Sequence, residues 1–192
     1  MSNPTPISIR PADPADLPHL PVIESASDQI FGATDMHSIA DSSPPSIESY
    51  TQAQSLGHIW VATPTNSTST TGVSAPPVAF ITIALHYNCE ALKSAFIHQI
   101  SVLPEYARQG IGGRLIEFVA VWAGENGFKA LELTTFEHVP WNKKYYERLG
   151  FKVLVGEEYD GEDAREVRER LEEERKDELL GKWSRVAMRK ML

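Results

Sequence analysis

One stretch decides the fold of this chain: Gln99-Ile-Ser-Val-Leu-Pro-Glu-Tyr-Ala-Arg-Gln-Gly-Ile-Gly-Gly-Arg-Leu-Ile116. Its apolar start, its closely spaced glycines and its helical end predict a β-strand that runs through a glycine turn into a helix. The first N–H groups of a helix have no partner within it, and they lie at the positive end of the helix dipole. The stretch therefore predicts a site for a phosphate or pyrophosphate at the start of the helix.

The glycine turn, Gly110-Ile-Gly-Gly113, does not match two well-known phosphate loops. No Gly-Lys-Ser/Thr follows it, as a Walker A loop requires, and Leu115 stands where a dinucleotide-binding G-x-G-x-x-G needs its third glycine. Glycines at such a junction can also serve only tight turning or close packing. The residues alone leave two interpretations open, a purely structural turn and a different pyrophosphate cradle.

Length and composition indicate one globular domain that spans residues 1–192, since 42% of the residues are hydrophobic and 23% are charged. No apolar run approaches the roughly 20 residues that cross a bilayer. Residues 1–6 also lack the basic and apolar regions of a secretory signal. The single cysteine, Cys89, fits a reducing compartment and is more typical of an ordinary thiol than of a nucleophile. We therefore expect a cytoplasmic protein with no membrane partner.

The net charge of −8 comes mostly from one segment. Residues 157–182 hold 12 of the 26 acidic residues and 6 of the 18 basic ones, a local charge of −6. Possible i,i+4 ion pairs and a thin apolar stripe through Val167 and Leu171 predict an acidic, solvated helical insertion before the last strand. No stripe of Lys and Arg occurs, so nucleic acid is not expected as a partner.

Apolar periodicity predicts the remaining elements. Short apolar runs predict strands at residues 7–10, 59–62, 78–86, 95–102, 130–136, 150–155 and 183–191. Helical spacing predicts helices at residues 47–55, 108–126 and 142–149, and an irregular helix after Asp13 that contains Pro18 and Pro21. Residues 64–77 carry almost no large apolar side chain and are predicted to form a flexible loop. This order predicts an α+β fold with a mixed sheet.

Two segments carry a family resemblance. Val102–Leu115 is similar to the motif Q/R-x-x-G-x-G/A, and Trp141–Phe151 is similar to N-x-x-x-[FY]-Y-x-x-x-G-F. Both motifs belong to the GNAT superfamily of acetyl-CoA-dependent N-acetyltransferases, which the whole chain therefore resembles. The resemblance implies a GNAT-like mixed, mostly antiparallel central sheet flanked by helices, with residues 95–102 and 130–136 as a splayed parallel pair. Ala107 departs from the Gln or Arg of the first motif, so no polar side-chain contact is expected from that position.

The resemblance implies acetyl-CoA as the co-substrate and no metal. Backbone N–H groups of the glycine turn would grip the pyrophosphate, namely those around Arg108, Gln109, Gly110, Ile111, Gly112, Gly113 and Arg114. Ile100, Ser101 and Val102 would bind the pantetheine amides, and Asn142 would contact the pantetheine arm. A plain helix N-cap is the alternative role for Asn142.

Acetyl transfer needs a base for the amine and an acid for the departing thiolate. Tyr146 occupies the tyrosine position of the second motif and resembles the general acid of the family. Its alternative role is a packing tyrosine whose hydroxyl is tied to the backbone. Tyr145, rotated by about 100° around the helix, is expected in the core. His98 resembles a histidine that assists deprotonation in the arylalkylamine branch, and a structural histidine is its alternative.

The acceptor is expected to be a primary amine, of a small molecule in preference to a protein N-terminus or lysine. Glu24 and Asp28 lie in the first helical region, which commonly walls the acceptor site in this family, and carboxylates there could hold an ammonium group. A solvated helix face explains these two carboxylates equally well. Glu137 and His138, in the loop after residues 130–136, are backup candidates for the base or for contacts with the amine, and an ordinary loop position is the favoured alternative for each. The other class of function is a non-catalytic acyl-CoA-binding domain, and the chain is expected to be a monomer or a homodimer.

Overall fold

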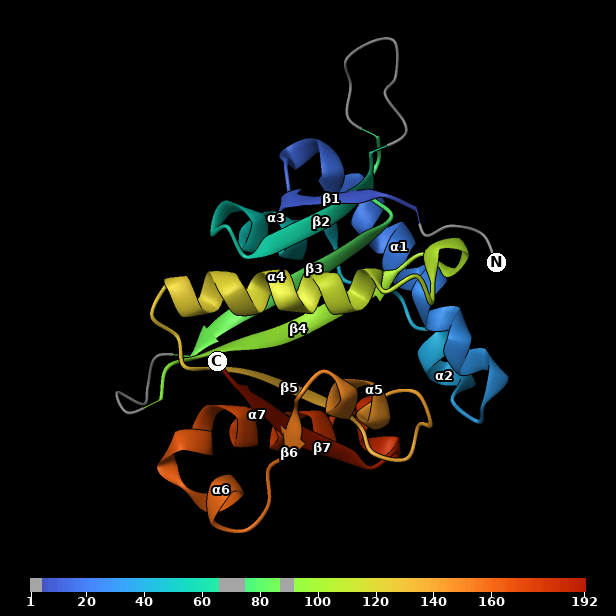
Figure 1. Cartoon of the computed structure of the whole chain (residues 1–192). Helices are drawn as coiled ribbons and strands as arrows, with labels where there is room; N and C mark the ends of the chain where they lie inside the picture. The colour runs from blue at the N-terminus through green and yellow to red at the C-terminus, as the bar shows by residue number, and fades with distance from the viewer. Residues whose placement is uncertain (1–4, 66–74, 87–91) are drawn as a thin grey trace. The chain divides into compact units, whose positions relative to one another are not determined.

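The computed structural model describes residues 5–65, 75–86 and 92–192. Within them, seven strands form one mixed sheet in the order β1-β2-β3-β4-β5-β7-β6 (Figure 1). The strands are β1 (Ile7–Pro11), β2 (Ile59–Pro64), β3 (Ala79–His86), β4 (Ser94–Val102), β5 (Ala130–Phe136), β6 (Lys152–Val153) and β7 (Arg185–Met191). Pairing is antiparallel between β1 and β2, β2 and β3, β5 and β7, and β6 and β7, and parallel between β4 and β5. The predicted α+β class is confirmed.

Helices connect these strands. The α-helices are α1 (Leu20–Asp28), α2 (His37–Ala40), α3 (Ile47–Ser55), α4 (Ile111–Glu125), α5 (Lys143–Arg148), α6 (Glu157–Asp160) and α7 (Arg165–Lys176). Short 3₁₀ turns are η1 (Pro14–His19), η2 (Gln29–Ala33), η3 (Pro104–Tyr106), η4 (Glu162–Ala164) and η5 (Leu180–Lys182). The predicted irregular helix is therefore two pieces, η1 and α1, with Pro18 inside the first and Pro21 in the first turn of the second. The short helix α2 is not predicted by any periodicity in the sequence.

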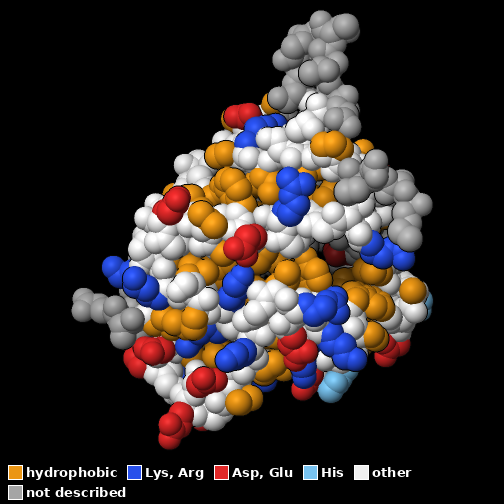
Figure 2. All heavy atoms as spheres, viewed as in Figure 1, with side chains coloured by type: hydrophobic (Ala, Val, Ile, Leu, Met, Phe, Trp, Pro, Cys, Tyr) orange, Lys and Arg blue, Asp and Glu red, His pale blue; other side chains and the backbone are white. Residues whose placement is uncertain are grey.

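The chain contains two compact units. The N-terminal unit comprises Met1–Ile83 and His98–Phe118. Its core is a cluster of buried side chains from η1, α1, α3, β2, β3 and the turn after β1, namely Ala12, Leu17, Leu20, Ile23, Tyr50, Ile59, Val61 and Phe80. Outside this cluster, Phe118 of α4 lies 6.5 Å from Trp60 between ring centroids, yet it stays 38% exposed. Figure 2 shows hydrophobic side chains among charged ones where α4 crosses the view.

The C-terminal unit comprises Ala84–Ile97 and Val119–Leu192. Its cluster joins β4 and β7 to the acidic segment through Phe96, Leu154, Ala164, Val167, Leu171 and Ala187. The acidic segment is helical as predicted, and its apolar stripe through Val167 and Leu171 is buried. Most of its acids are exposed, but Glu174 of α7 is buried together with the stripe. Glu174 accepts a hydrogen bond from Arg185 Nε at 2.9 Å, so an acid of this segment is tied to the sheet rather than only to its own helix.

The parallel ladder between β4 and β5 is short. It comprises the pairs Ser94–Ala130, Ala95–Leu131 and Phe96–Glu132, although the two strands have nine and seven residues. Beyond Glu132, β5 continues its register with β7 as far as the pair Phe136–Arg185. The predicted strand pair is therefore present, and its pairing is restricted to the first residues of both strands.

Two expectations lie at least partly outside the described residues. Most of the loop predicted at residues 64–77 does so, since residues 66–74 are not described, and so does Cys89. Among the helices that the structure does describe, none combines the length and the apolar character needed to cross a membrane.

Candidate active site

The glycine turn joins β4 to α4 in the N-terminal unit. After β4 ends at Val102, the chain makes the turn η3, and α4 begins at Ile111 rather than at residue 108. Arg108 and Gly110 both have left-handed backbone conformations, with φ of 60° and 79°. We call Arg108–Arg114 the cradle. Residues 108–110 are needed to reverse the chain, and that is why the helix starts later than its apolar period predicts.

Gly110 is required for its backbone conformation rather than for space. A Cβ added at Gly110 would meet no other atom within 4 Å, whereas a positive φ is strained for side chains other than glycine. The N–H of Arg114 donates to the carbonyl of Gly110 at 3.0 Å, which is the first bond of the helix ladder. By helix geometry, the N–H groups of residues 111–113 then point out of the helix start. This arrangement fits an anionic group such as a pyrophosphate.

The strand before the cradle carries four of the predicted residues. His98 is exposed, Ile100 and Val102 are half-buried, and Ser101 is buried. Because side chains alternate along a strand, His98, Ile100 and Val102 share one face of β4. Ser101 lies on the other face, where its hydroxyl accepts a hydrogen bond from Gln99 Nε2 at 2.9 Å. The structure thus brings the candidate base and two predicted cofactor-binding residues onto the same face of β4.

Two polar side chains of the cradle bind the chain's own backbone. Gln109 Oε1 accepts a hydrogen bond from the N–H of Thr5 at 2.9 Å, and Gln109 Nε2 donates to the carbonyl of Glu105 at 3.3 Å. Arg114 Nη2 donates to the carbonyl of Ile7 at 3.1 Å. These contacts engage the side chains of Gln109 and Arg114 within the chain, and the grip by the backbone donors of the cradle stays a prediction.

Asn142 and Tyr146 lie at α5 in the C-terminal unit. The carbonyl of Asn142 accepts hydrogen bonds from the N–H groups of Tyr145 and Tyr146, at 2.9 and 3.2 Å, whereas its side chain does not cap the helix. Asn142 is therefore the N-cap residue of α5 by position, as the alternative role has it, although its side chain makes no capping hydrogen bond. Its amide remains available for the cofactor contact that the resemblance implies.

Tyr146 packs edge-on between two aromatic rings, with centroid distances of 5.3 Å to Tyr145 and 5.8 Å to Phe151. Both tyrosines are half-buried, so the expectation that Tyr145 is a core aromatic is wrong. Burial raises the pKa of Tyr146 above its ordinary value, Tyr145 adds to this, and the charge of Arg185 opposes it. The phenol is therefore protonated at physiological pH. Within the described part of the chain, its hydroxyl makes no hydrogen bond to the backbone, so the structure does not favour the alternative of a hydroxyl tied to the backbone.

Glu137 and His138 follow β5 in the same unit. The Glu137 carboxylate accepts a hydrogen bond from Ser184 Oγ at 2.7 Å and lies 3.7 Å from His138 Nε2. The hydrogen bond from Ser184 is the main cause of a lowered pKa at Glu137. Glu137 is thus a charged group held by the residue before β7, whereas His138 is 80% exposed. Of the two side chains, Glu137 is held in place more firmly. It is therefore the better candidate for contacting a cation.

Glu24 and Asp28 lie one helical turn apart on α1, in the N-terminal unit. Glu24 is buried, and one of its oxygens accepts a short hydrogen bond from the hydroxyl of Tyr50 on α3. Burial raises the pKa of Glu24, which the bond from Tyr50 opposes. Burial and, next, repulsion by Glu24 raise the pKa of Asp28 to about 7. Among the described residues, no basic side chain is recorded as a partner of either carboxylate, so this pair is suited to an added cation.

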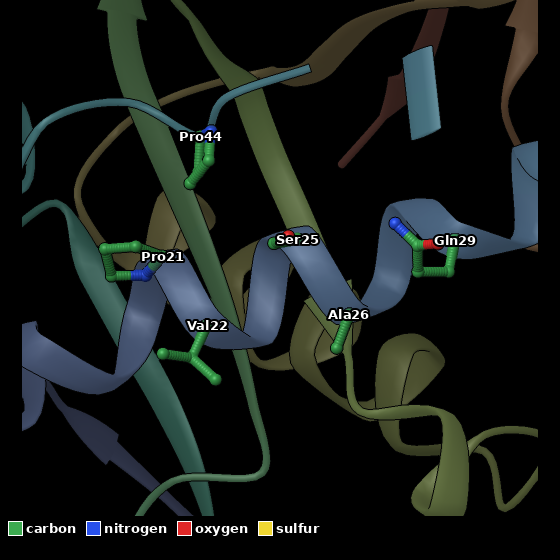
Figure 3. A pocket seen from close by; sticks show the side chains of 6 residues that line it. All are labelled: Pro21, Val22, Ser25, Ala26, Gln29 and Pro44. Carbon is green, nitrogen blue, oxygen red and sulfur yellow. The ribbon is translucent and has the colours of Figure 1, made fainter. Parts of the chain in front are cut away.

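A shallow hollow of about 520 Å³ lies on a different face of α1. Its lining is mostly proline and small side chains, as Figure 3 shows: Pro21, Val22, Ser25, Ala26, Gln29 and Pro44. The hollow has no charged side chain to orient an ammonium group. The carboxylates of Glu24, which is buried, and of Asp28, which is half-buried, are therefore the stronger candidates for amine recognition.

Tyr50 is a functional candidate that the sequence analysis missed. The helix that carries it was predicted correctly, but its contact with Glu24 joins residues 26 positions apart, and nothing local in the sequence indicates it. Among the residues that the structure describes, no group of three or more His, Cys, Asp or Glu side chains is placed to hold a metal ion.

Comparison with known proteins identifies the fold. A model of the acetyltransferase (GNAT) family matches residues 31–151, more than half of the chain. A GNAT-family acetyltransferase from Listeria monocytogenes is 14% identical with a TM-score of 0.65, covering 97% of this chain and 95% of that one. The ribosomal-protein-S18-alanine N-acetyltransferase of Escherichia coli is 18% identical with a TM-score of 0.60, covering 97% and 94%. The PaiA N-acetyltransferase of Thermoplasma acidophilum, in complex with coenzyme A, is 18% identical with a TM-score of 0.60, covering 97% and 99%. These matches confirm the predicted GNAT-like fold.

Proposed function

This chain belongs to the acetyltransferase (GNAT) family, and we propose that it transfers the acetyl group of acetyl-CoA to a primary amine of a small molecule. The observation that carries the proposal is the cradle, where two left-handed residues, Arg108 and Gly110, turn β4 into α4. Backbone donors at the positive end of α4 suit the pyrophosphate of coenzyme A. The Thermoplasma protein was crystallised with coenzyme A, which supports the same co-substrate here.

In the proposed reaction acetyl-CoA supplies an activated acetyl group as a thioester. The amine nitrogen forms a bond to the acetyl carbon, and the bond from that carbon to sulfur breaks. His98 accepts the proton that the ammonium group must lose, directly or through water. Tyr146 donates its hydroxyl proton to the departing thiolate, which the raised pKa of Tyr146 permits because the phenol stays protonated. Backbone groups at Ile100 to Val102 and the amide of Asn142 are assigned to the pantetheine arm.

One assay tests this function against the alternatives. Purified protein is incubated with acetyl-CoA and a panel of small amines, peptides with a free N-terminus and peptides with an internal lysine, while free thiol is measured. We expect small amines to accelerate thiol release most. Acceleration only by peptides would make the protein an acetyltransferase of N-termini or lysines. Coenzyme A binding without acceleration by any amine would indicate a non-catalytic binding domain.

Two other parts of the proposal need separate measurements. The molecular mass in solution tests whether the protein is a monomer or a homodimer, as proposed. Cell fractionation tests the proposed cytoplasmic location.

The role of His98 predicts a specific pH dependence. Because a general base must be unprotonated to accept a proton, the wild-type kcat/KM should fall as the solution becomes more acidic. His98→Ala should lower the rate at neutral pH by about 10²-fold or more and should lose this acidic limb. His138→Ala serves as the control and should keep it. If the limb survives in His98→Ala and disappears in His138→Ala, the base is His138.

The pair Glu24 and Asp28 predicts a pH-dependent affinity for cationic amines. The pKa of Asp28 is raised to about 7, so Asp28 gains its charge as the pH rises through that value and should then attract an ammonium group more strongly. The KM of the amine should therefore fall from pH 6 to pH 8, which lie roughly one unit below and above the pKa of Asp28. Asp28→Asn should raise KM at the upper pH by about 10-fold, the loss of one hydrogen bond to a charged group. Asp35→Asn, at an exposed acid before α2, should leave KM unchanged. Equal KM values in both variants would remove Asp28 from the acceptor site.

A further inference from the structure

The outer edge of β1 has two backbone groups that the cradle binds. Strand β1 is the first strand in the sheet order, so one of its edges is open. Thr65, just after β2, donates its N–H to the carbonyl of Pro6 at 3.0 Å, so that carbonyl faces β2. Backbone groups of successive residues alternate in direction along a strand. The N–H of Thr5 and the carbonyl of Ile7 therefore face the open edge, where Gln109 and Arg114 meet them.

The sequence around Thr5 leaves one donor for this contact. Pro4 and Pro6 flank Thr5, and proline has no backbone N–H. Of these three residues, Thr5 alone has a backbone N–H to donate. Gln109 Oε1 accepts a hydrogen bond from it at 2.9 Å. The other end of the same side chain, Gln109 Nε2, donates to the carbonyl of Glu105 at 3.3 Å. The amide of Gln109 therefore bridges the edge of the sheet and the turn before the left-handed residue Arg108.

We propose that Gln109 is a positioning residue that fastens the cradle to the sheet edge through Thr5, and so holds the backbone donors in place for acetyl-CoA. The proposal rests on the proposed function, since it assumes that the cradle binds the co-substrate. A turn with two left-handed residues, one of them Arg108, is strained and needs support from surrounding contacts. The bond from Arg114 to Ile7 gives the first turn of α4 a parallel attachment to the same edge.

Substitutions at Thr5 test the attachment without touching the cradle. Thr5→Pro removes the N–H donor, whereas the matched control Thr5→Ala removes the hydroxyl and keeps the N–H. Binding of coenzyme A is measured directly by titration calorimetry, and kcat is measured at saturating co-substrate. Thr5→Pro should weaken coenzyme A binding by about 2- to 10-fold, the value of one hydrogen bond. Thr5→Ala should bind as the wild type does, and kcat should be unchanged in both variants.

A second substitution shows whether both residues act through one contact. Gln109→Ala should weaken binding at least as much as Thr5→Pro, and the double variant should be no weaker than Gln109→Ala alone, because the two changes remove the same bond. If Gln109→Ala weakens binding and Thr5→Pro does not, Gln109 contacts the co-substrate directly and the proposal is wrong. Additive effects in the double variant would also contradict it. If the wild type itself fails to bind coenzyme A, the proposed function fails instead.

Discussion

Tyr146→Phe is expected to lower kcat by about 10²- to 10⁴-fold, the usual contribution of a positioned general acid. The substitution removes a single oxygen and keeps the ring that packs against Phe151. Burial raises the pKa of Tyr146 above the ordinary tyrosine value of 10. The wild-type phenol should therefore stay protonated up to pH 10, and kcat should not fall there through ionisation of Tyr146. Steady-state kinetics with acetyl-CoA and the best amine of the panel give kcat, and calorimetry should show unchanged binding of coenzyme A.

Tyr145→Phe is the matched control, because it makes the same change at the next residue of α5, where the pKa is also raised by burial. Its kcat should stay close to that of the wild type. A second readout uses an acetyl thioester whose thiol is a stronger acid than that of coenzyme A, since such a leaving group needs less protonation. The deficit of Tyr146→Phe should shrink with that substrate. A wild-type rate in Tyr146→Phe, or a deficit that is the same for both thioesters, would refute the assignment as general acid.

Elements with a clear local pattern could be predicted from the sequence. Helix α3 (Ile47–Ser55) and strand β5 (Ala130–Phe136) match their predicted ranges at both ends, since each has a clear local pattern of apolar residues. Strand β6 is shorter than predicted, at Lys152–Val153. Gly150 before it has a φ of 90°, so the chain is still turning where the apolar run begins.

Contacts between distant residues could not be predicted in this way. The bond from Thr5 to Gln109 joins residues 104 positions apart. The bond from Arg185 to Glu174 joins strand β7 to helix α7, two elements with different apolar periods. Hydrophobic periodicity identifies which face of an element is buried but not which polar group it meets there. The family motifs supplied the positions of Tyr146 and the cradle, whereas the contacts that hold the cradle depend on residues far away in the sequence.

Glu132→Gln is expected to destabilise the protein by about 3 kcal/mol, the lower end for breaking a buried ion pair by removing one partner. Glu132 is 1% exposed. One of its oxygens accepts bonds from Arg189 Nη2 and Nε at 2.6 and 2.8 Å. The other oxygen accepts a bond from Ser94 Oγ at 2.6 Å and lies 3.4 Å from His86 Nδ1. Glutamine keeps an acceptor for Ser94 but leaves the guanidinium of Arg189, whose side chain is 11% exposed, without a charge to balance it. Urea denaturation at neutral pH measures the loss.

The position of Glu132 explains why this loss should also reach the active site. Phe96 and Glu132 form the last pair of the parallel ladder, and the Glu132 side chain ties β4, through Ser94, to β7, through Arg189, at that point. Weakening this tie loosens the strands where their pairing ends, so Glu132→Gln should raise the KM for acetyl-CoA as well as lower stability. Glu173→Gln, at a 71% exposed acid that pairs with Arg170 at 3.8 Å, is the matched control and should change stability by no more than about 0.5 kcal/mol.

The stability that Glu132 contributes should depend on pH in one definite direction. Burial alone would raise the pKa of Glu132, but bonds from His86 and Ser94 and the charge of Arg189 outweigh it, so the folded-state pKa lies below the ordinary 4.5. A carboxyl group with a lowered pKa stabilises the fold above its unfolded-state value and loses that contribution as the pH falls through its folded-state value. The difference in unfolding free energy between wild type and Glu132→Gln should therefore be largest above about pH 4.5 and should shrink in more acidic solution. A difference that grows as the pH falls would mean that Glu132 is protonated in the native protein and that Arg189 is balanced by another group.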